Sequence, residues 1–174
     1  MPGQVKAIIP KEFDTQAVMD TLRAEVKKFA PFLVKDFEQT TAGWTGEKPK
    51  FTPVIKPQAG QIVLEIRVLG PEHGREKWHW LNAGTKPHKI RPKNAKSLKF
   101  PGGHYSAGST PGSIHTSRAR RGSGPSVHAM EVNHPGTKAR GWTAILVKEN
   151  QRPFERWMRA AMKKAARESG HAQG

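Results

Sequence analysis

A basic stretch in the middle of the chain sets the organisation of the whole sequence. Residues 77–130 contain ten lysine and arginine residues and no aspartate or glutamate. The tripeptide Gly-Thr-Lys occurs inside this stretch at 84–86 and again after it at 136–138. Only 35% of all residues are hydrophobic, so part of the chain is expected to lie outside any core. We interpret the segments before the two tripeptides as a frame for them, and the segment after them as a helix that closes this frame.

The bulk properties limit the possible classes of protein. A chain of 174 residues fits one domain, and we expect a single domain over 1–174. The formal net charge of +16 requires a polyanionic or acidic partner, or a place in a larger assembly. Because there is no cysteine, disulfides and thiolate metal sites are excluded. No apolar run has the length of a signal peptide or a membrane span, so we expect a cytosolic or intracellularly assembled protein.

Two long helices are predicted, one towards each end of the chain. Apolar residues recur at helical spacing from Val18 to Phe37, which predicts a helix over about 14–41 that is kinked or broken near Pro31. A second helical pattern runs from Trp142 to the glycine at 170, with a kink expected at Pro153. Its first part, 142–148, is also rich in β-forming residues, so a strand is the alternative there.

Alternating apolar and polar residues predict short strands between these helices. Residues 51–55 and 62–68 are expected to form a β-hairpin in which the second strand is well buried. Residues 75–82 are expected to form a short helix that ends at Gly84. Further strands are expected at 88–92, 98–100 and 127–132. The result is an α+β fold with a small, mainly antiparallel sheet packed by a long N-terminal helix and a long C-terminal helix.

Glycine, serine, proline and arginine dominate residues 101–126. This segment offers almost no large apolar side chain for burial, apart from Tyr105 and Ile114. The composition predicts a long flexible basic loop or arm within the single domain. Loops of this length in compact domains are usually functional or become ordered against a partner.

The central stretch lacks the residues that most catalytic sites need. Without an acidic residue it cannot supply the carboxylate pair of an acid–base site or the oxygen ligands of a two-metal nuclease. No nucleophile motif or phosphate-binding loop is present. Seven histidines precede residue 140, but none has the spacing of a metal-ligand pair, and His128 and His134 are expected to share one face of a single strand. We therefore expect no catalytic residue, no metal and no cofactor.

The cations of the central stretch allow two interpretations. They could follow the phosphate backbone of a nucleic acid, or they could form a solvated face or a contact with an acidic neighbouring subunit. No recognition helix accompanies them, so sequence-specific DNA recognition is not expected. The residues concerned, with the histidine among them, are Lys86, His88, Lys89, Arg91, Lys93, Lys96 and Lys99.

The tryptophans are also open to two interpretations. Trp142 and Trp157 lie at helical spacing among apolar residues and are expected in the core. Trp78 and Trp80 adjoin the basic turn and could instead anchor an interface with a partner.

Two segments together resemble a known family. The first, residues 81–103, is Leu-Asn-Ala-Gly-Thr-Lys-Pro-His-Lys-Ile-Arg-Pro-Lys-Asn-Ala-Lys-Ser-Leu-Lys-Phe-Pro-Gly-Gly, and the second, residues 132–142, is Val-Asn-His-Pro-Gly-Thr-Lys-Ala-Arg-Gly-Trp. This pair, separated by a variable loop and followed by a basic helix, is similar to the tail-completion (neck, minor tail) proteins of long-tailed bacteriophages. The resemblance runs from about residue 15 to the C-terminus. The chain departs from the family pattern at Gly141-Trp142 and in the unusually basic segment 118–121.

The resemblance implies a structural role in the virion, after assembly in the host cytoplasm, and no enzymatic role. It implies a homo-oligomeric ring, expected to be a hexamer, at the head-proximal end of the tail, with phage DNA passing through it without sequence-specific contacts. The implied partners are tail terminator, tail tube and head–tail connector proteins. Subunit or DNA-lumen contacts are expected at the seven residues named above and at Arg118, Arg120, Arg121, Lys138 and Arg140, with motif turns at Gly84, Thr85, Pro87, Pro135, Gly136 and Thr137.

Two other functions remain open at this point. A free-standing basic protein that binds nucleic acid non-specifically would show a steep dependence of affinity on salt. A metal-dependent nuclease would cleave DNA in a reaction that a chelator abolishes, and we expect no such activity.

Overall fold

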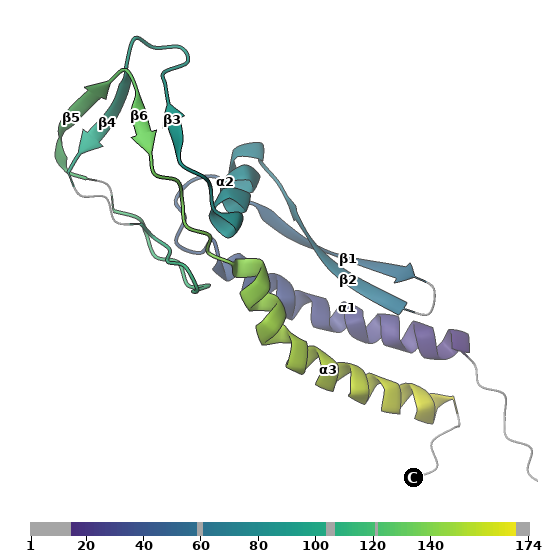
Figure 1. The fold of residues 1–174 in the computed structure, drawn as a ribbon. Helices are drawn as coiled ribbons and strands as arrows, with labels where there is room; N and C mark the ends of the chain where they lie inside the picture. Colours follow the sequence, from purple (N-terminus) through teal and green to yellow (C-terminus); the bar gives the residue numbers. More distant parts are fainter. Residues whose placement is uncertain (1–14, 59–60, 104–106, 121, 170–174) are drawn as a thin grey trace, which may run out of the picture.

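The chain forms an α+β fold, which confirms the predicted class. The computed structural model describes residues 15–58, 61–103, 107–120 and 122–169. Figure 1 shows an elongated body of helices and one hairpin, from which a smaller group of strands projects at one end. The elements in chain order are α1 (Thr15–Gln39), β1 (Lys50–Gln58), β2 (Gln61–Leu69), α2 (Glu72–Ala83), β3 (His88–Ile90), β4 (Leu98–Gly102), β5 (Gly124–Ala129), β6 (Val132–His134) and α3 (Trp142–Glu168).

Helix α1 is one uninterrupted helix, although Pro31 lies inside it. The predicted helix is therefore confirmed, and of the two effects expected at the proline, a kink or a break, the break is wrong. Pro31 is exposed, so water can hydrate the carbonyl group that its missing N–H leaves without a partner. The buried positions Val18, Leu22, Val26 and Phe29 recur at the predicted spacing and form one stripe along the helix.

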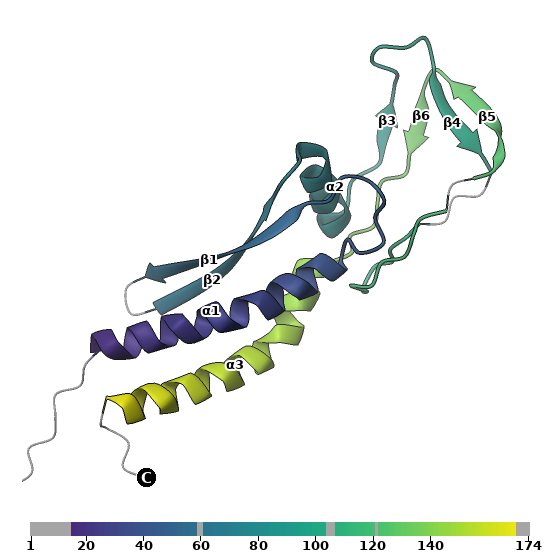
Figure 2. The same ribbon diagram turned by 180° about the vertical axis from the view of Figure 1, so that it is seen from behind.

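Helix α3 begins at Trp142, so the helix preferred for 142–148 is confirmed over the strand. It continues through Pro153 to Glu168, and Figure 2 shows that it bends along its length as it follows α1. The two helices run antiparallel and side by side. The small residues Ala161 and Ala165 are buried against α1, where their size allows the two backbones to approach closely.

The second part of the core lies where α1, β1, α2 and α3 meet. It contains Phe37, Phe51, Trp78, Trp142 and Leu146. Trp78 is only 2% exposed and its indole N–H donates to Thr40 Oγ1 at 2.9 Å, so of its two interpretations, core residue or interface anchor, the interface anchor is wrong. The neighbouring Trp80 is 49% exposed. The helical position of Trp78 faces the core, and that of Trp80 does not.

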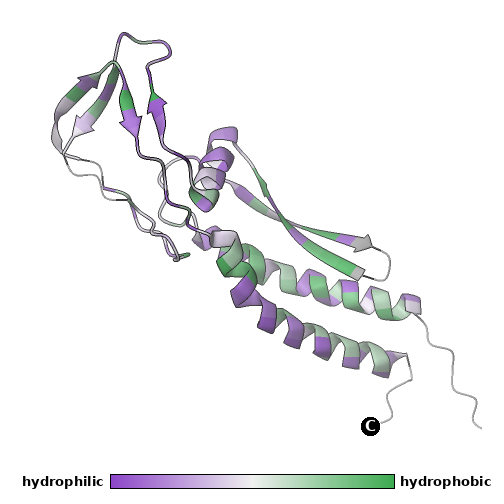
Figure 3. Ribbon diagram, in the orientation of Figure 1, coloured by the Kyte–Doolittle hydropathy of each residue, from purple (hydrophilic) through white to green (hydrophobic). Residues whose placement is uncertain are grey.

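The strands form three separate antiparallel pairs, β1–β2, β3–β6 and β4–β5, instead of one continuous sheet. The predicted hairpin is confirmed as β1–β2, which packs on α1. Its second strand is half-buried from Ile62 to Ile66, so the prediction of a well-buried strand is wrong. The body thus has three layers, the hairpin, α1 and α3, and Figure 3 shows hydrophobic and hydrophilic residues alternating along both long helices.

The strand predicted at 127–132 is two strands. β5 ends at Ala129, and β6 begins at Val132 after a turn at 130–131. β5 pairs with β4, whereas β6 pairs with β3. The alternating pattern is continuous through the turn, so it could not show that the chain changes its partner strand there.

The segment between β4 and β5 is irregular, as its composition predicted, but its middle lies against the body. Ile114 packs against the core, and the Trp142 indole N–H donates to Ser113 O at 2.9 Å. Thr116 Oγ1 accepts from Gly43 N–H at 2.9 Å. Residues 107–119 are therefore held mainly by polar contacts, which a low content of apolar residues does not reveal.

Candidate functional site

The two Gly-Thr-Lys tripeptides lie side by side and bond to each other. Thr85 N–H donates to Thr137 O at 2.9 Å, and Thr137 N–H donates to Thr85 O at 3.1 Å. Thr85 Oγ1 also accepts from Thr137 N–H at 3.0 Å. We call residues 84–86 and 136–138 the GTK clasp. The repeat seen in the sequence is thus one structural unit made of two segments that lie 52 residues apart.

Both clasp glycines are required by the local geometry. Gly84 has a φ of +78° and Gly136 a φ of +85°, values that residues with a Cβ atom rarely adopt. A Cβ atom at Gly84 would lie 2.7 Å from Thr137 O, and one at Gly136 would lie 2.3 Å from Thr85 O. Each glycine therefore allows the opposite segment to approach. The turns predicted at these positions are wrong, because both segments run on through an antiparallel bridge between Thr85 and Thr137.

The clasp is the centre of a longer antiparallel ribbon. On the body side, Arg140 N–H donates to Leu81 O at 2.9 Å and Gly141 N–H donates to Asn82 O at 3.1 Å. On the other side, β3 and β6 continue the pairing, with His88 opposite His134. We call residues 88–102 and 124–134 the lobe. The ribbon joins the lobe to the body, and Figure 1 shows the lobe projecting away from the helices.

His88 and His134 stack across the β3–β6 pair, with ring centroids 4.9 Å apart. The expected shared face of His128 and His134 is therefore wrong, because β5 and β6 belong to different pairs. His134 Nδ1 accepts from Gly136 N–H at 3.0 Å, which places the proton of the neutral ring on Nε2 and leaves no lone pair there for a metal. The described residues contain no group of three His, Asp or Glu side chains that could hold a metal ion.

Two cations of the central stretch are paired within the chain. Glu131, in the turn between β5 and β6, accepts from Lys89 Nζ at 2.8 Å and from Arg91 Nε at 2.6 Å. Hydrogen bonds from Lys89 and then Arg91 hold the pKa of the Glu131 carboxyl below its ordinary value. This first acid after the acid-free stretch therefore reduces the charge that the lobe presents to a partner.

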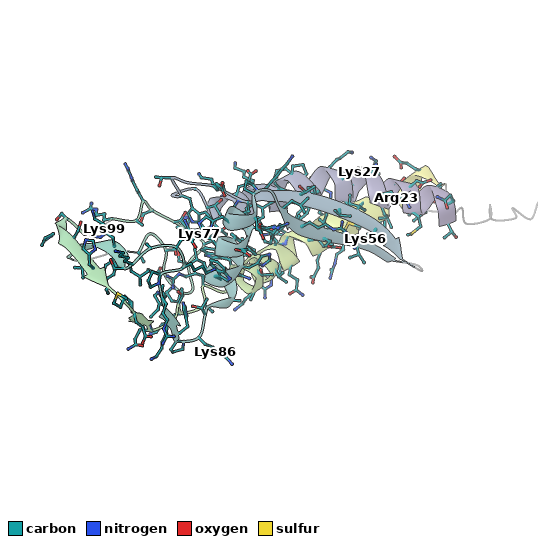
Figure 4. All side chains as sticks on the ribbon, turned by 90° about the horizontal axis from the view of Figure 1, so that it is seen from above. Arg23, Lys27, Lys56, Lys77, Lys86 and Lys99 are labelled. Atoms are coloured by element: carbon teal, nitrogen blue, oxygen red, sulfur yellow. The ribbon has the colours of Figure 1, made fainter. Side chains whose placement is uncertain are left out.

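Most of the remaining predicted cations are exposed. Figure 4 shows Lys86 and Lys99 at the periphery of the molecule, away from the helices. Arg140 differs, because it is only 8% exposed and its Nε donates to Ser109 Oγ at 3.1 Å, so its expected surface contact is wrong. Arg121 lies outside the described residues. Among the cations predicted for the site, those that are exposed and form no salt bridge within the described residues are Lys86, Lys93, Lys96, Lys99, Arg118, Arg120 and Lys138.

The lobe also exposes apolar side chains that the sequence reasoning missed, and the paired Phe100 and Val127 form an apolar face on β4–β5. Phe100 lies opposite Val127 in the β4–β5 register, and both are exposed. Ile90 is exposed as well, and Met130 at the turn is 71% exposed. The alternation of Leu98, Phe100 and Val127 with polar residues was the available signal. This alternation predicts strands, but it does not show whether a second layer covers them.

Comparisons with protein-family models, with curated proteins and with solved structures gave no match. Within the described residues, no helix combines the length and the apolar character needed to cross a bilayer.

Proposed function

We propose that this chain is a structural virion protein of a long-tailed bacteriophage, a tail-completion or head–tail joining component that forms a ring around the DNA passage. The proposal includes a non-catalytic role, a ring of six copies, and tail terminator, tail tube and head–tail connector proteins as partners. The proposed place is the neck of the virion, reached after assembly in the host cytoplasm.

The observation that carries the proposal is the GTK clasp. The resemblance to the tail-completion family rests on two separated segments, and these segments bond to each other through Thr85 and Thr137. Two unrelated segments that resembled a family by chance would have no reason to pair in register. The reciprocal fit of Gly84 and Gly136 supports the interpretation of the motif pair as one structural element.

The form of the lobe supports an assembled state. Isolated two-stranded pairs are marginally stable in water, and β4–β5 has neither a third strand nor a helix packed on it among the described residues. Its exposed Phe100 and Val127 would be covered by a neighbouring subunit. Because the lobe and the body have different surfaces, a contact between them is heterologous, and such contacts produce rings when the rotation closes.

The exposed cations fit a lumen that DNA passes through. Lys93, Lys96 and Lys99 lie in or beside β4 and have no acidic partner in the described part of the chain. Contacts between lysine side chains and phosphates do not depend on the base sequence, so a duplex could move past these residues. Such a surface gives electrostatic contact without sequence specificity.

Assembly in vitro tests the proposal. The purified chain is mixed with tails that lack it, and the tails are examined by negative-stain electron microscopy. We expect a ring at one end of each tail and restored joining to heads. Unchanged tails, with the protein remaining monomeric in native mass spectrometry, would contradict the proposal.

The second candidate is a free-standing protein that binds nucleic acid non-specifically, which the unpaired exposed lysines favour. It predicts tight duplex binding by the isolated monomer, with affinity that falls steeply as salt rises. Electrophoretic mobility shifts over a range of salt concentrations separate the two candidates. Weak binding by the monomer together with assembly onto tails favours the ring.

A further inference from the structure

A cavity of about 650 Å³ lies between the body, the irregular segment and the clasp. The body contributes Trp44, Lys77 and Leu81, the irregular segment contributes Ser109, and the chain after the clasp contributes Arg140. Its volume is within the range of small-molecule sites. None of the described residues that line it is acidic. Lys138 and His134 line it as well.

Arg140 brings a buried positive charge to this cavity. Its Nε donates to Ser109 Oγ at 3.1 Å and its Nη1 donates to Lys138 O at 3.0 Å. Both acceptors are uncharged, and no Asp or Glu of the described residues forms a salt bridge with Arg140. A guanidinium has five N–H donors, so further donors are available on the same side chain. Ser109 uses its oxygen as an acceptor here, which leaves its O–H free to donate.

Lys77 brings a second cation to the cavity. Its Nζ lies 4.1 Å from the centroid of the Trp44 ring, and Figure 4 shows Lys77 between the body and the lobe. Burial lowers the pKa of Lys77, because no carboxylate offsets the loss of water around its ammonium group. The aromatic ring stabilises the cation only partly. The cavity therefore holds two partly desolvated positive charges and no negative one.

We propose that this cavity binds a phosphate-class oxyanion. Buried charges are unfavourable unless they are paired, and a dianion would neutralise Arg140 and Lys77 together. Arginine and lysine side chains are the usual phosphate ligands, and the Ser109 hydroxyl adds a neutral donor. A singly charged carboxylate would leave one of the two cations without a partner.

The position of the cavity separates this ligand from duplex DNA. Arg140 is 8% exposed and lies behind the irregular segment, whereas the phosphates of a duplex lie on a convex surface. The ligand is therefore a free phosphate or the phosphate monoester of a small molecule. This inference is independent of the proposed role in the virion, because it depends only on the charges that line the cavity.

Calorimetric titration of the full chain tests the inference. Inorganic phosphate and adenosine monophosphate are titrated separately, with ionic strength held constant by sodium chloride. We expect saturable binding of at least one of them at a single site, with Lys77→Gln raising Kd about tenfold, the effect of losing one charge-assisted contact. Tighter binding of inorganic phosphate identifies the free ion, and tighter binding of the monophosphate identifies the ester.

Lys86→Gln is the matched control, since Lys86 is exposed and does not line this cavity. It should leave Kd unchanged. Lys77 makes no hydrogen bond among the described residues, and its side chain contacts the Trp44 ring. Lys77→Gln is therefore expected to fold, and thermal unfolding of the variant without ligand checks this. The absence of saturable binding, or equal weakening by Lys77→Gln and Lys86→Gln, would overturn the inference.

Discussion

At the scale of single residues, the GTK clasp depends on positions where no side chain fits. Gly136→Ala is expected to destabilise the protein by about 2–4 kcal/mol, from left-handed backbone strain and a collision with Thr85 O. Urea unfolding measured by tryptophan fluorescence gives the free energy. Gly112→Ala is the control, because Gly112 has a φ of +79° but open space around its Cβ position. Gly112→Ala should lower the free energy of unfolding only by the backbone strain, about 1–2 kcal/mol. Equal effects of the two substitutions would show that the close approach at Gly136 contributes nothing.

The hydrogen bond between Trp78 and Thr40 gives a second prediction at this scale. Thr40→Val keeps the shape of the side chain but leaves the buried indole N–H without an acceptor, which should cost about 1–3 kcal/mol. Thr41→Val is the control, because Thr41 Oγ1 bonds only to Glu38 O and leaves no buried donor without a partner. Urea unfolding of both variants measures the difference. A loss for Thr41→Val as large as that for Thr40→Val would contradict this account.

Single residues also show where sequence reasoning succeeds and where it stops. The repeated tripeptide marks the glycines at 84 and 136 as special backbone positions, but it does not show that the two segments pair instead of turning. The burial of Arg140 and Trp78 could not be recognised, since both occur among exposed cations and polar residues in the sequence. Their burial depends on the irregular segment and on α1, and contacts between such distant segments leave no local pattern.

At the scale of elements, the packing of α1 on α3 depends on one face of each helix. Phe29 is 5% exposed and contacts the rings of Phe154 and Trp157, whereas Phe32 is 56% exposed. Phe29→Ala should destabilise the protein by about 3–5 kcal/mol. Phe32→Ala removes the same group from a mostly exposed site, so the loss in free energy of unfolding should be clearly smaller than for Phe29→Ala. Thermal unfolding by circular dichroism compares them, and a larger effect of Phe32→Ala would show that the two helices pack through a different face.

The link between Glu131 and strand β3 gives a prediction about charge and pH. Glu131→Gln frees Lys89 and Arg91, so duplex binding at low salt should tighten and the salt dependence should steepen by about one to two phosphate contacts. Glu149→Gln on α3 changes the net charge equally and should have a smaller effect. Mobility-shift assays measure both, and identical effects would show that only net charge matters.

The same carboxylate makes the lobe sensitive to acid. Because the pKa of Glu131 is lowered in the folded state, its contacts stabilise the lobe above the ordinary glutamate pKa and are lost as pH falls through the lowered value. NMR signals of β3 and β6 should therefore change in that acidic range in the wild type. They should not change there in Glu131→Gln, and a matching acid transition in the variant would assign it to another group.

Elements differ in how far the sequence predicts them. The two long helices follow from the spacing of their apolar residues, which is preserved across Pro31 and Pro153. The strands were placed nearly correctly, but their division into three pairs was not predicted. Alternation shows which residues share a face. It does not show which strand is the neighbour, and the change of partner at 130–131 leaves the alternation intact.

At the scale of the whole molecule, the chain separates a helical body from a cationic lobe with an exposed apolar face (Figure 1). The repeated tripeptide points to the two segments of the clasp, one inside the central stretch and one after it. The exposure of the apolar residues Ile90, Phe100, Val127 and Met130 could not be predicted, since it depends on the absence of a covering layer among the described residues. Both features are accounted for if neighbouring subunits cover the face and the cations remain open to DNA.

Cryo-electron microscopy of virions of the phage that encodes this chain tests the proposed ring most directly. We predict closed-ring density for this fold at the head-proximal end of the tail, with the apolar face of each lobe against the next subunit and the DNA channel through the centre. Density for the chain elsewhere in the particle, or its absence from purified virions, would contradict the proposal.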